Sequence, residues 1–215
     1  MKKKNVSLDD ILLPNQSEYR DEDRLKIYHR LYDKGFDEAV DPIIVTSPGP
    51  LDQYKKEMDE YFSKKSDNPT NSVRINQSID QRRKEAEHVF QKVEEYGLWL
   101  LDGSHRSIAA TLNGREHIDA LEVEEDSDIQ ELEQMIQSGE LINFPHSGKK
   151  VDEMRESFLS YAMGYSSGEL PPKGVTLGTD SKVRVKGTVK DYVNTLIEKS
   201  EGEEGLPNYM IENME

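Results

Sequence analysis

The sequence contains no cysteine, and this absence removes several classes of chemistry. Structural disulfides, thiolate zinc sites, iron–sulfur clusters and cysteine nucleophiles are all excluded, and nothing requires an oxidising compartment. No apolar run approaches the length of about 18 residues that is typical of a membrane helix. Asp9 and Asp10 also fall where the apolar part of a signal peptide would lie. We therefore expect a cytoplasmic protein without membrane association.

Basic residues are in the minority: 28 Lys and Arg stand against 43 Asp and Glu, which gives a net charge of −15. The segment from Glu122 to Gly148 contains no Lys or Arg. Because a surface of this charge repels a phosphate backbone, we expect weak or no binding to generic duplex DNA. The basic cluster Gln81–Lys84 is compatible with a local phosphate contact, but it equally fits a solvated helix face.

Hydrophobic periodicity predicts helices alternating with short strands. Turn signals rich in Gly, Pro, Asn and Ser separate them. The predicted helices cover 23–34, 51–65, 78–95, 105–112, 128–138, 151–163 and 189–199; the predicted strands cover 42–45, 98–101, 118–123 and 182–186; 8–20 is an extended segment with a turn at Pro14-Asn15, 164–180 a loop, and the chain from about 201 a frayed tail.

The stretch Leu98–Arg106 is where the sequence indicates chemistry. Four apolar residues predict a strand buried on both faces, Asp102-Gly103 predicts a tight turn, and a helix follows. A helix that starts in this way presents unpaired backbone N–H groups, which bind phosphate well. Gly103 lets the backbone approach a ligand closely, and Ser104 can cap the helix or donate to phosphate.

The charged residues of this turn suit phosphate chemistry. Arg106 can clamp phosphate oxygens, and His105 can donate to phosphate or shuttle a proton. Asp102 can hold Mg²⁺ or act as a general base. The same residues also fit an ordinary Asp-Gly turn with a serine cap, and their spacing alone does not decide between the two interpretations.

The residues Asp-Gly-Ser-His-Arg-Ser-Ile-Ala-Ala-Thr-Leu-Asn-Gly at 102–114 resemble the signature of the ParB/sulfiredoxin superfamily. In that family an apolar strand leads through a glycine turn with basic residues into an Ala-rich helix that ends in Gly. Ile11–Asn15, Arg20 and Pro42–Val45 resemble the N-terminal box of ParB proteins in order and approximate spacing, and Ile118–Val123 fits the strand after the signature helix. The resemblance covers about 8–123 and is interrupted at about 46–95.

This resemblance implies an α+β fold of α/β character: a small mixed-sheet, nucleotide-binding domain over 1–125, with a helical insertion at about 46–95. The ligand would be an NTP, ATP or CTP, with its phosphates at Gly103, Ser104, His105, Arg106 and Ser107. Residues 126–215 would form an acidic, mostly helical C-terminal extension.

The fold alone does not determine the activity, because one fold can carry many functions. Departures from the family pattern exclude some of the activities known in the superfamily. Sulfiredoxins carry their catalytic Cys where Ser104 stands, so sulfinic acid reduction is excluded. Partition-type ParB proteins carry Glu at the position of Ser104 and Arg at that of His105, and they continue into a basic helix-turn-helix that we do not find here. The form Asp-Gly-x-His-Arg is nearest the branch of free-serine kinases, in which the aspartate acts on the hydroxyl acceptor.

Three functions remain as expectations. The first is Mg²⁺-dependent NTP hydrolysis or phosphoryl transfer to a small hydroxyl-bearing acceptor, with Asp102 and His105 catalytic and Asp102 a metal ligand. Loss of Arg106 would then weaken nucleotide binding without unfolding the protein. The second is a non-catalytic nucleotide-sensing or DNA-partition-related adaptor that acts on a protein partner, and the third is a purely structural protein. Elsewhere, no metal-ligand spacing connects the remaining histidines, and Asn143–Gly148 fits a plain loop or a lid.

Overall fold

The computed structural model describes residues 1–14, 21–49, 51–162 and 185–200, and it shows a mixed α+β fold. Its centre is a six-stranded sheet in the order β1-β5-β3-β4-β2-β6. Neighbouring strands along this order are alternately antiparallel and parallel, so the sheet is mixed. The strands are β1 (Lys2–Ser7), β2 (Ile11–Pro14), β3 (Ile43–Thr46), β4 (Leu98–Asp102), β5 (His117–Glu122) and β6 (Val185–Thr188).

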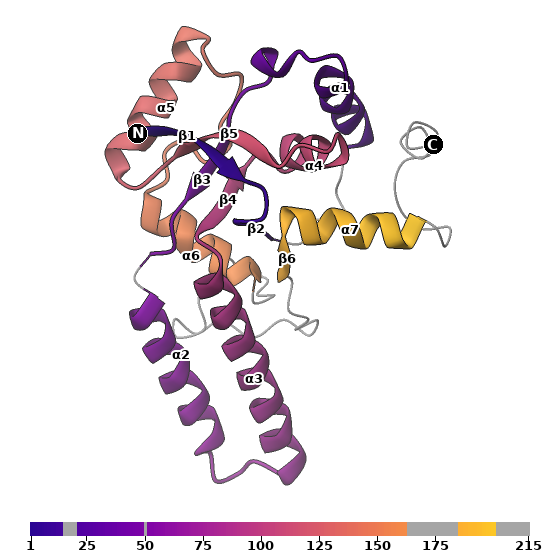
Figure 1. Cartoon of the computed structure of the whole chain (residues 1–215). Coiled ribbons are helices and arrows are strands. Elements are labelled where there is room, and N and C mark those ends of the chain that lie inside the picture. The colour runs from indigo at the N-terminus through magenta and orange to yellow at the C-terminus, as the bar shows by residue number, and fades with distance from the viewer. Residues whose placement is uncertain (15–20, 50, 163–184, 201–215) are drawn as a thin grey trace.

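Both faces of the sheet are covered by helices (Figure 1). Successive strand residues point to opposite faces, so Ile43 and Val45 belong to one hydrophobic cluster and Ile44 to another. The first cluster is closed by α1 (Glu22–Asp33), α4 (Ser104–Leu112) and α7 (Val189–Ser200). The opposite face is closed by α5 (Asp126–Ser138) and α6 (Val151–Ala162). A short 3-10 helix, Asp37–Ala39, precedes β3.

The chain between β3 and β4 forms a helical hairpin of α2 (Leu51–Ser66) and α3 (Val73–Glu95). The hairpin projects away from the sheet, and its base joins the core, where Trp99 stacks on Phe158 with 4.7 Å between the ring centroids (Figure 1). α3 begins five residues before the predicted start at Ser78, because Ser72 caps the helix by accepting the Ile75 N–H at 3.3 Å.

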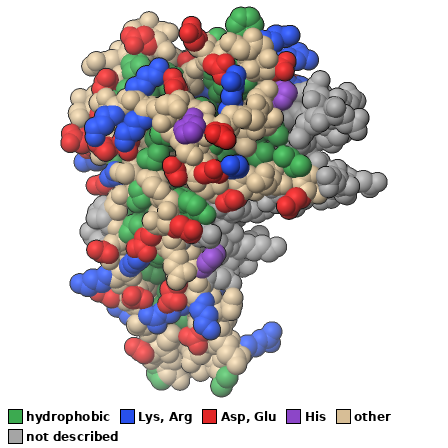
Figure 2. Space-filling view, viewed as in Figure 1, with side chains coloured by type: hydrophobic (Ala, Val, Ile, Leu, Met, Phe, Trp, Pro, Cys, Tyr) green, Lys and Arg blue, Asp and Glu red, His purple; other side chains and the backbone are tan. Residues whose placement is uncertain are grey.

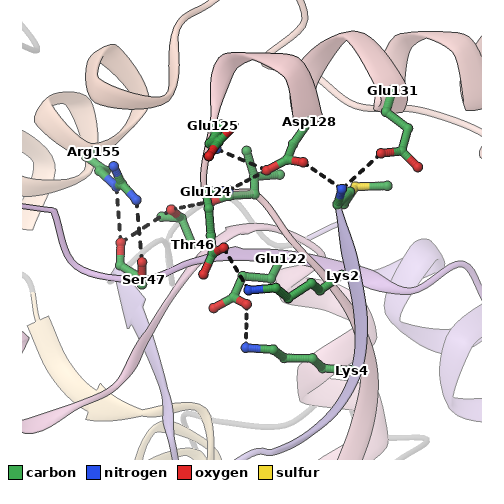
Figure 3. A network of polar contacts seen from close by, with 12 residues as sticks. Lys2, Lys4, Thr46, Ser47, Glu122, Glu124, Glu125, Asp128, Glu131 and Arg155 are labelled. Atoms are coloured by element: carbon green, nitrogen blue, oxygen red, sulfur yellow. Dashed lines mark hydrogen bonds and ion pairs between the residues drawn. The ribbon is translucent and has the colours of Figure 1, made fainter.

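β1 is not predicted by hydrophobic periodicity, because its first residues are three lysines. The strand forms as the edge partner of β5, and its lysines pair with carboxylates of the acidic segment at and beyond β5 (Figure 3). Lysines on an edge strand also discourage pairing with another chain. The ion pairs are Lys2–Glu124 at 3.0 Å, Lys3–Asp119 at 3.1 Å and Lys4–Glu122.

The remaining predicted elements agree with the structure to within a few residues. β6 begins at Val185 rather than at 182 and pairs with β2, so the C-terminal part of the chain supplies one strand of the sheet. The division at 125 stays a prediction. Part of the predicted turn at Pro14-Asn15, together with Arg20, the loop 164–180 and the tail from 201, lies outside the described residues. Among the described helices, none combines the length and apolar character needed to cross a membrane.

Candidate functional site

The turn between β4 and α4 is the strand-to-helix turn predicted over 102–106. β4 ends at Asp102, Gly103 adopts φ 106° and ψ 25°, and α4 begins at Ser104. A β-carbon on residue 103 would lie 2.6 Å from Cγ2 of Ile43. Glycine is therefore required here both by the left-handed backbone and by the close packing of the turn against β3.

The first turn of α4 directs its backbone N–H groups past the end of β4. The first intrahelical hydrogen bond runs from the Ser107 N–H to the Gly103 carbonyl at 2.9 Å. As at every helix N-terminus, the amides before it have no intrahelical acceptor, and Gly103 has no side chain that could cap them. The positive end of the helix dipole lies at the same point, an arrangement that favours an anion.

The Arg106 side chain is buried and bonded within the protein. Its Nη1 donates to the carbonyls of Asp41 at 2.8 Å and Pro42 at 2.6 Å, and its Nη2 donates to Asp102 Oδ2 at 2.5 Å. The residue is 7% exposed. The guanidinium that the sequence predicts as a phosphate clamp thus holds the turn to the segment before β3.

Asp102 lies at the exposed end of β4. Its side chain is 25% exposed, and Oδ2 is held by Arg106. Among the described residues, Asp102 bonds Arg106 through Oδ2 alone. Within the described ranges, no three His, Asp or Glu side chains are grouped as a metal site. Asp102 alone therefore offers Mg²⁺ one carboxylate, which suits a metal that arrives bound to phosphates and not one held by the protein.

His105 faces the start of α1. Its Nε2 accepts the backbone N–H of Asp21 at 3.0 Å, and Asp21 in turn caps α1. An accepting Nε2 carries no proton, so the neutral ring holds its proton on Nδ1. In this arrangement Nε2 of His105 orients the turn. A role in proton transfer through Nε2 requires the Asp21 bond to open.

The two serines of the turn differ in their surroundings. Ser104 is half-buried at the first position of α4. Ser107 is fully buried, and its hydroxyl donates to the Ser104 carbonyl at 3.0 Å. Of these two predicted phosphate ligands, Ser104 is the one that lies at the helix end.

His146 also belongs to this site, and the sequence offers no spacing that would identify it. Its Nε2 lies 3.0 Å from the Leu101 carbonyl, one residue before Asp102, and its ring packs edge-on against Phe144. Burial lowers the pKa of His146, Lys149 lowers it further, and the Leu101 carbonyl and Asp102 partly oppose this. A neutral imidazole therefore holds the end of β4.

The loop that carries His146 has a second anchor close to the turn. The Ile142 N–H donates to Asp41 Oδ2 at 2.9 Å, and the Asp41 carbonyl accepts from Arg106. The segment Ile142–His146 is thus fixed both to the partner of Arg106 and to the strand end beside Asp102. This segment therefore lies beside the β4–α4 turn.

No protein-family model, curated protein or solved structure gives a significant match to this chain.

Proposed function

We propose that this chain binds a nucleoside triphosphate, ATP or CTP, with its phosphates at the N-terminal end of α4. The observation that carries the proposal is the turn itself, in which Gly103 packs against Ile43 and offers no side chain to cap the first helical amides. This geometry supports phosphate recognition by backbone N–H groups, with the Ser104 hydroxyl as a further donor. The resemblance of 102–114 to the ParB/sulfiredoxin signature favours the same ligand class and a fold of that type.

The substitution Ser104→Asp tests the phosphate site without removing a structural contact. An acidic residue in the first helical turn suits the dipole, so the melting temperature should not fall, but the carboxylate repels a phosphate at the same place. We expect nucleotide affinity to fall at least about tenfold. Val73→Asp is the matched control, since it places the same charge at the first position of α3, where Val73 is exposed.

Calorimetry and thermal shift with ATP, CTP, GTP and ADP, each with Mg²⁺, decide the proposal. A ligand at 100 times its Kd stabilises the fold by about 2.7 kcal/mol. The proposal would be overturned if none of the nucleotides produced either a heat of binding or a shift in melting temperature. Equal loss of affinity in Ser104→Asp and Val73→Asp would place the ligand elsewhere.

The proposal extends to NTP hydrolysis or phosphoryl transfer to a hydroxyl acceptor. Asp102 is the candidate proton acceptor, because it is partly exposed and lies directly before the turn. Asp102→Asn keeps the size of the side chain and removes its charge, so we expect formation of the nucleoside diphosphate, the product of both reactions, to fall while nucleotide affinity changes little. Mg²⁺ would enter with the triphosphate.

A non-catalytic nucleotide sensor is the second candidate, and the Asp102–Arg106 ion pair favours it. The carboxylate is already compensated by a guanidinium at 2.5 Å, which suits a structural tie as well as a base. Tight nucleotide binding without formation of the nucleoside diphosphate, equal in wild type and Asp102→Asn, would select the sensor.

A further inference from the structure

The distal half of the helical hairpin carries a cleft that the proposed nucleotide site does not use. The cleft lies between α2 and α3 and has a volume of about 600 Å³. Its apolar lining includes Tyr61, Ile75 and Ile79, and its cations are Lys64, Lys65 and Arg82.

The lining residues follow helical spacing and form a continuous face. Ile75, Ile79 and Arg82 are four and three residues apart on α3, so they lie on one side of that helix. On α2 the Lys65 ammonium lies over the Tyr61 ring, 5.7 Å from its centroid. Ile75 is 48% exposed, and hydrophobic side chains reach the surface at the tip of the hairpin (Figure 2). Within the described part of the chain, α2 and α3 leave this apolar stripe uncovered, and a third helix would cover it.

The same half of the hairpin is positively charged in an acidic protein. Residues 59–84, the distal halves of α2 and α3 with their connection, contain six Lys and Arg against four Asp and Glu, whereas the whole chain carries −15. Arg74 lies in the first turn of α3, where the helix dipole disfavours a cation, and that turn has no acidic residue. Helix stability therefore does not account for this cation at the tip.

The tip is far enough from the acidic body to act on its own charge. A helix of 23 residues such as α3 is about 35 Å long. At physiological salt the field of a surface charge decays over about 8 Å. A partner that approaches the distal half thus meets the local positive charge more strongly than the net charge of the chain.

We propose that this cleft binds an acidic amphipathic helix of a partner protein, which completes a three-helix bundle. The apolar face of that helix packs on Tyr61, Ile75 and Ile79, and its carboxylates meet Lys64, Lys65 and Arg82. Glu57 and Glu60 line the end of the cleft nearer the sheet, so the acidic end of the partner lies at the tip. The same two carboxylates and the aliphatic floor suit a nucleic acid strand poorly, because a phosphate backbone would run past them.

Fluorescence anisotropy on the full chain tests the proposal with three defined probes. The first is a synthetic peptide of about five helical turns with Leu on one face and Glu on the others. The second has the same composition with its Leu residues dispersed, and the third is a single-stranded oligonucleotide. We expect the amphipathic peptide to bind at least about tenfold more tightly than either of the others at physiological salt.

Two double variants with reversed charges distinguish binding in the cleft from non-specific electrostatic attraction. Lys64→Glu with Arg82→Glu should weaken peptide binding at least about tenfold. Lys56→Glu with Lys84→Glu makes the same change in charge at exposed hairpin positions outside the cleft lining, and it should leave the affinity within about twofold. Ile75→Ser should also weaken binding, which ion pairing alone would not cause. Circular dichroism checks that each variant remains helical.

Three results would overturn the proposal. They are failure of the wild type to bind the amphipathic peptide, equal loss in the two doubles, and tighter binding of the oligonucleotide than of the peptide. None of them depends on whether α4 binds a nucleotide.

Discussion

The Arg106 guanidinium donates a 2.5 Å hydrogen bond to Oδ2 of Asp102, which ends β4 four residues earlier in the chain. Its other donors bind the carbonyls of Asp41 and Pro42, so one buried side chain joins the β4–α4 turn to the segment before β3. The charge of Arg106 is therefore compensated by protein groups more than by water. Stability and the geometry of the candidate site depend on the same contacts.

Arg106→Ala should lower the free energy of unfolding by about 2–4 kcal/mol, somewhat less than a fully buried pair because Asp102 is partly exposed. The substitution leaves one carboxylate and two carbonyls without their donor. This replaces the expectation from the motif that loss of Arg106 spares the fold. Arg115→Ala is the control, since its pair with Asp37 is exposed and worth about 0–1 kcal/mol. Equal losses in urea denaturation would contradict the structural role of Arg106.

The local part of the site is predictable from sequence, and the non-local part is not. An apolar strand, Asp-Gly and an Ala-rich segment determine the turn through backbone preferences that act within a few residues. The carbonyl acceptors of Arg106, on Asp41 and Pro42, lie more than sixty residues earlier in the chain, and His146 lies 45 residues after Leu101. No spacing rule connects such residues. A guanidinium is equally suited to phosphate and to protein carbonyls, so its partner becomes visible only in the fold.

The edge strand β1 also depends on contacts that are distant in the sequence. In the sequence Lys2–Lys4 resemble an irregular polar segment and not a strand. The carboxylates that pair with these lysines lie more than a hundred residues away, in and after β5. The acidic character of that segment is visible in the sequence, but its pairing with the first strand is a tertiary contact.

Gly103→Ala should destabilise the fold far more than Gly114→Ala. Both glycines have positive φ, at 106° and 69°, so each alanine meets the left-handed cost of about 1–2 kcal/mol. Only at 103 does the new β-carbon also meet Cγ2 of Ile43, at 2.6 Å, while at 114 nothing lies within 4 Å. Chemical denaturation of both variants measures the difference. Similar losses would show that the turn has room to move away from β3.

Asp128→Asn should remove an acid-sensitive part of the stability. Burial raises the pKa of Asp128, but hydrogen bonds from the Met1 ammonium and from the Glu124 and Glu125 N–H groups outweigh burial and lower it below its ordinary value (Figure 3). A lowered pKa in the folded state stabilises above the unfolded pKa, and this contribution is lost as the pH falls through the folded value.

The wild type should therefore exceed Asp128→Asn in stability at pH 7, and the two should converge below about pH 4. Glu131→Gln is the control, because Glu131 is 52% exposed and contacts only the Met1 ammonium in the same network. A constant difference between wild type and Asp128→Asn across this range would contradict the lowered pKa.

His146→Gln should remove a pH dependence on the other side of neutrality. Burial holds the pKa of His146 below its ordinary value, so between the folded and unfolded pKa values the unfolded chain binds the extra proton. Stability linked to His146 is thus complete above about pH 6.5 and is lost as the pH falls towards the pKa of the folded state.

Glutamine can still donate to the Leu101 carbonyl but does not titrate. The advantage of the wild type over His146→Gln should therefore be largest near neutral pH and shrink on acidification. Other histidines and carboxylates titrate alike in both proteins, so the difference between their denaturation curves isolates this ring. His88→Gln, at an exposed position on α3, is the control for replacing a histidine by glutamine. Parallel curves for the wild type and His146→Gln would mean that burial does not hold the pKa of the His146 ring below its ordinary value in the folded state.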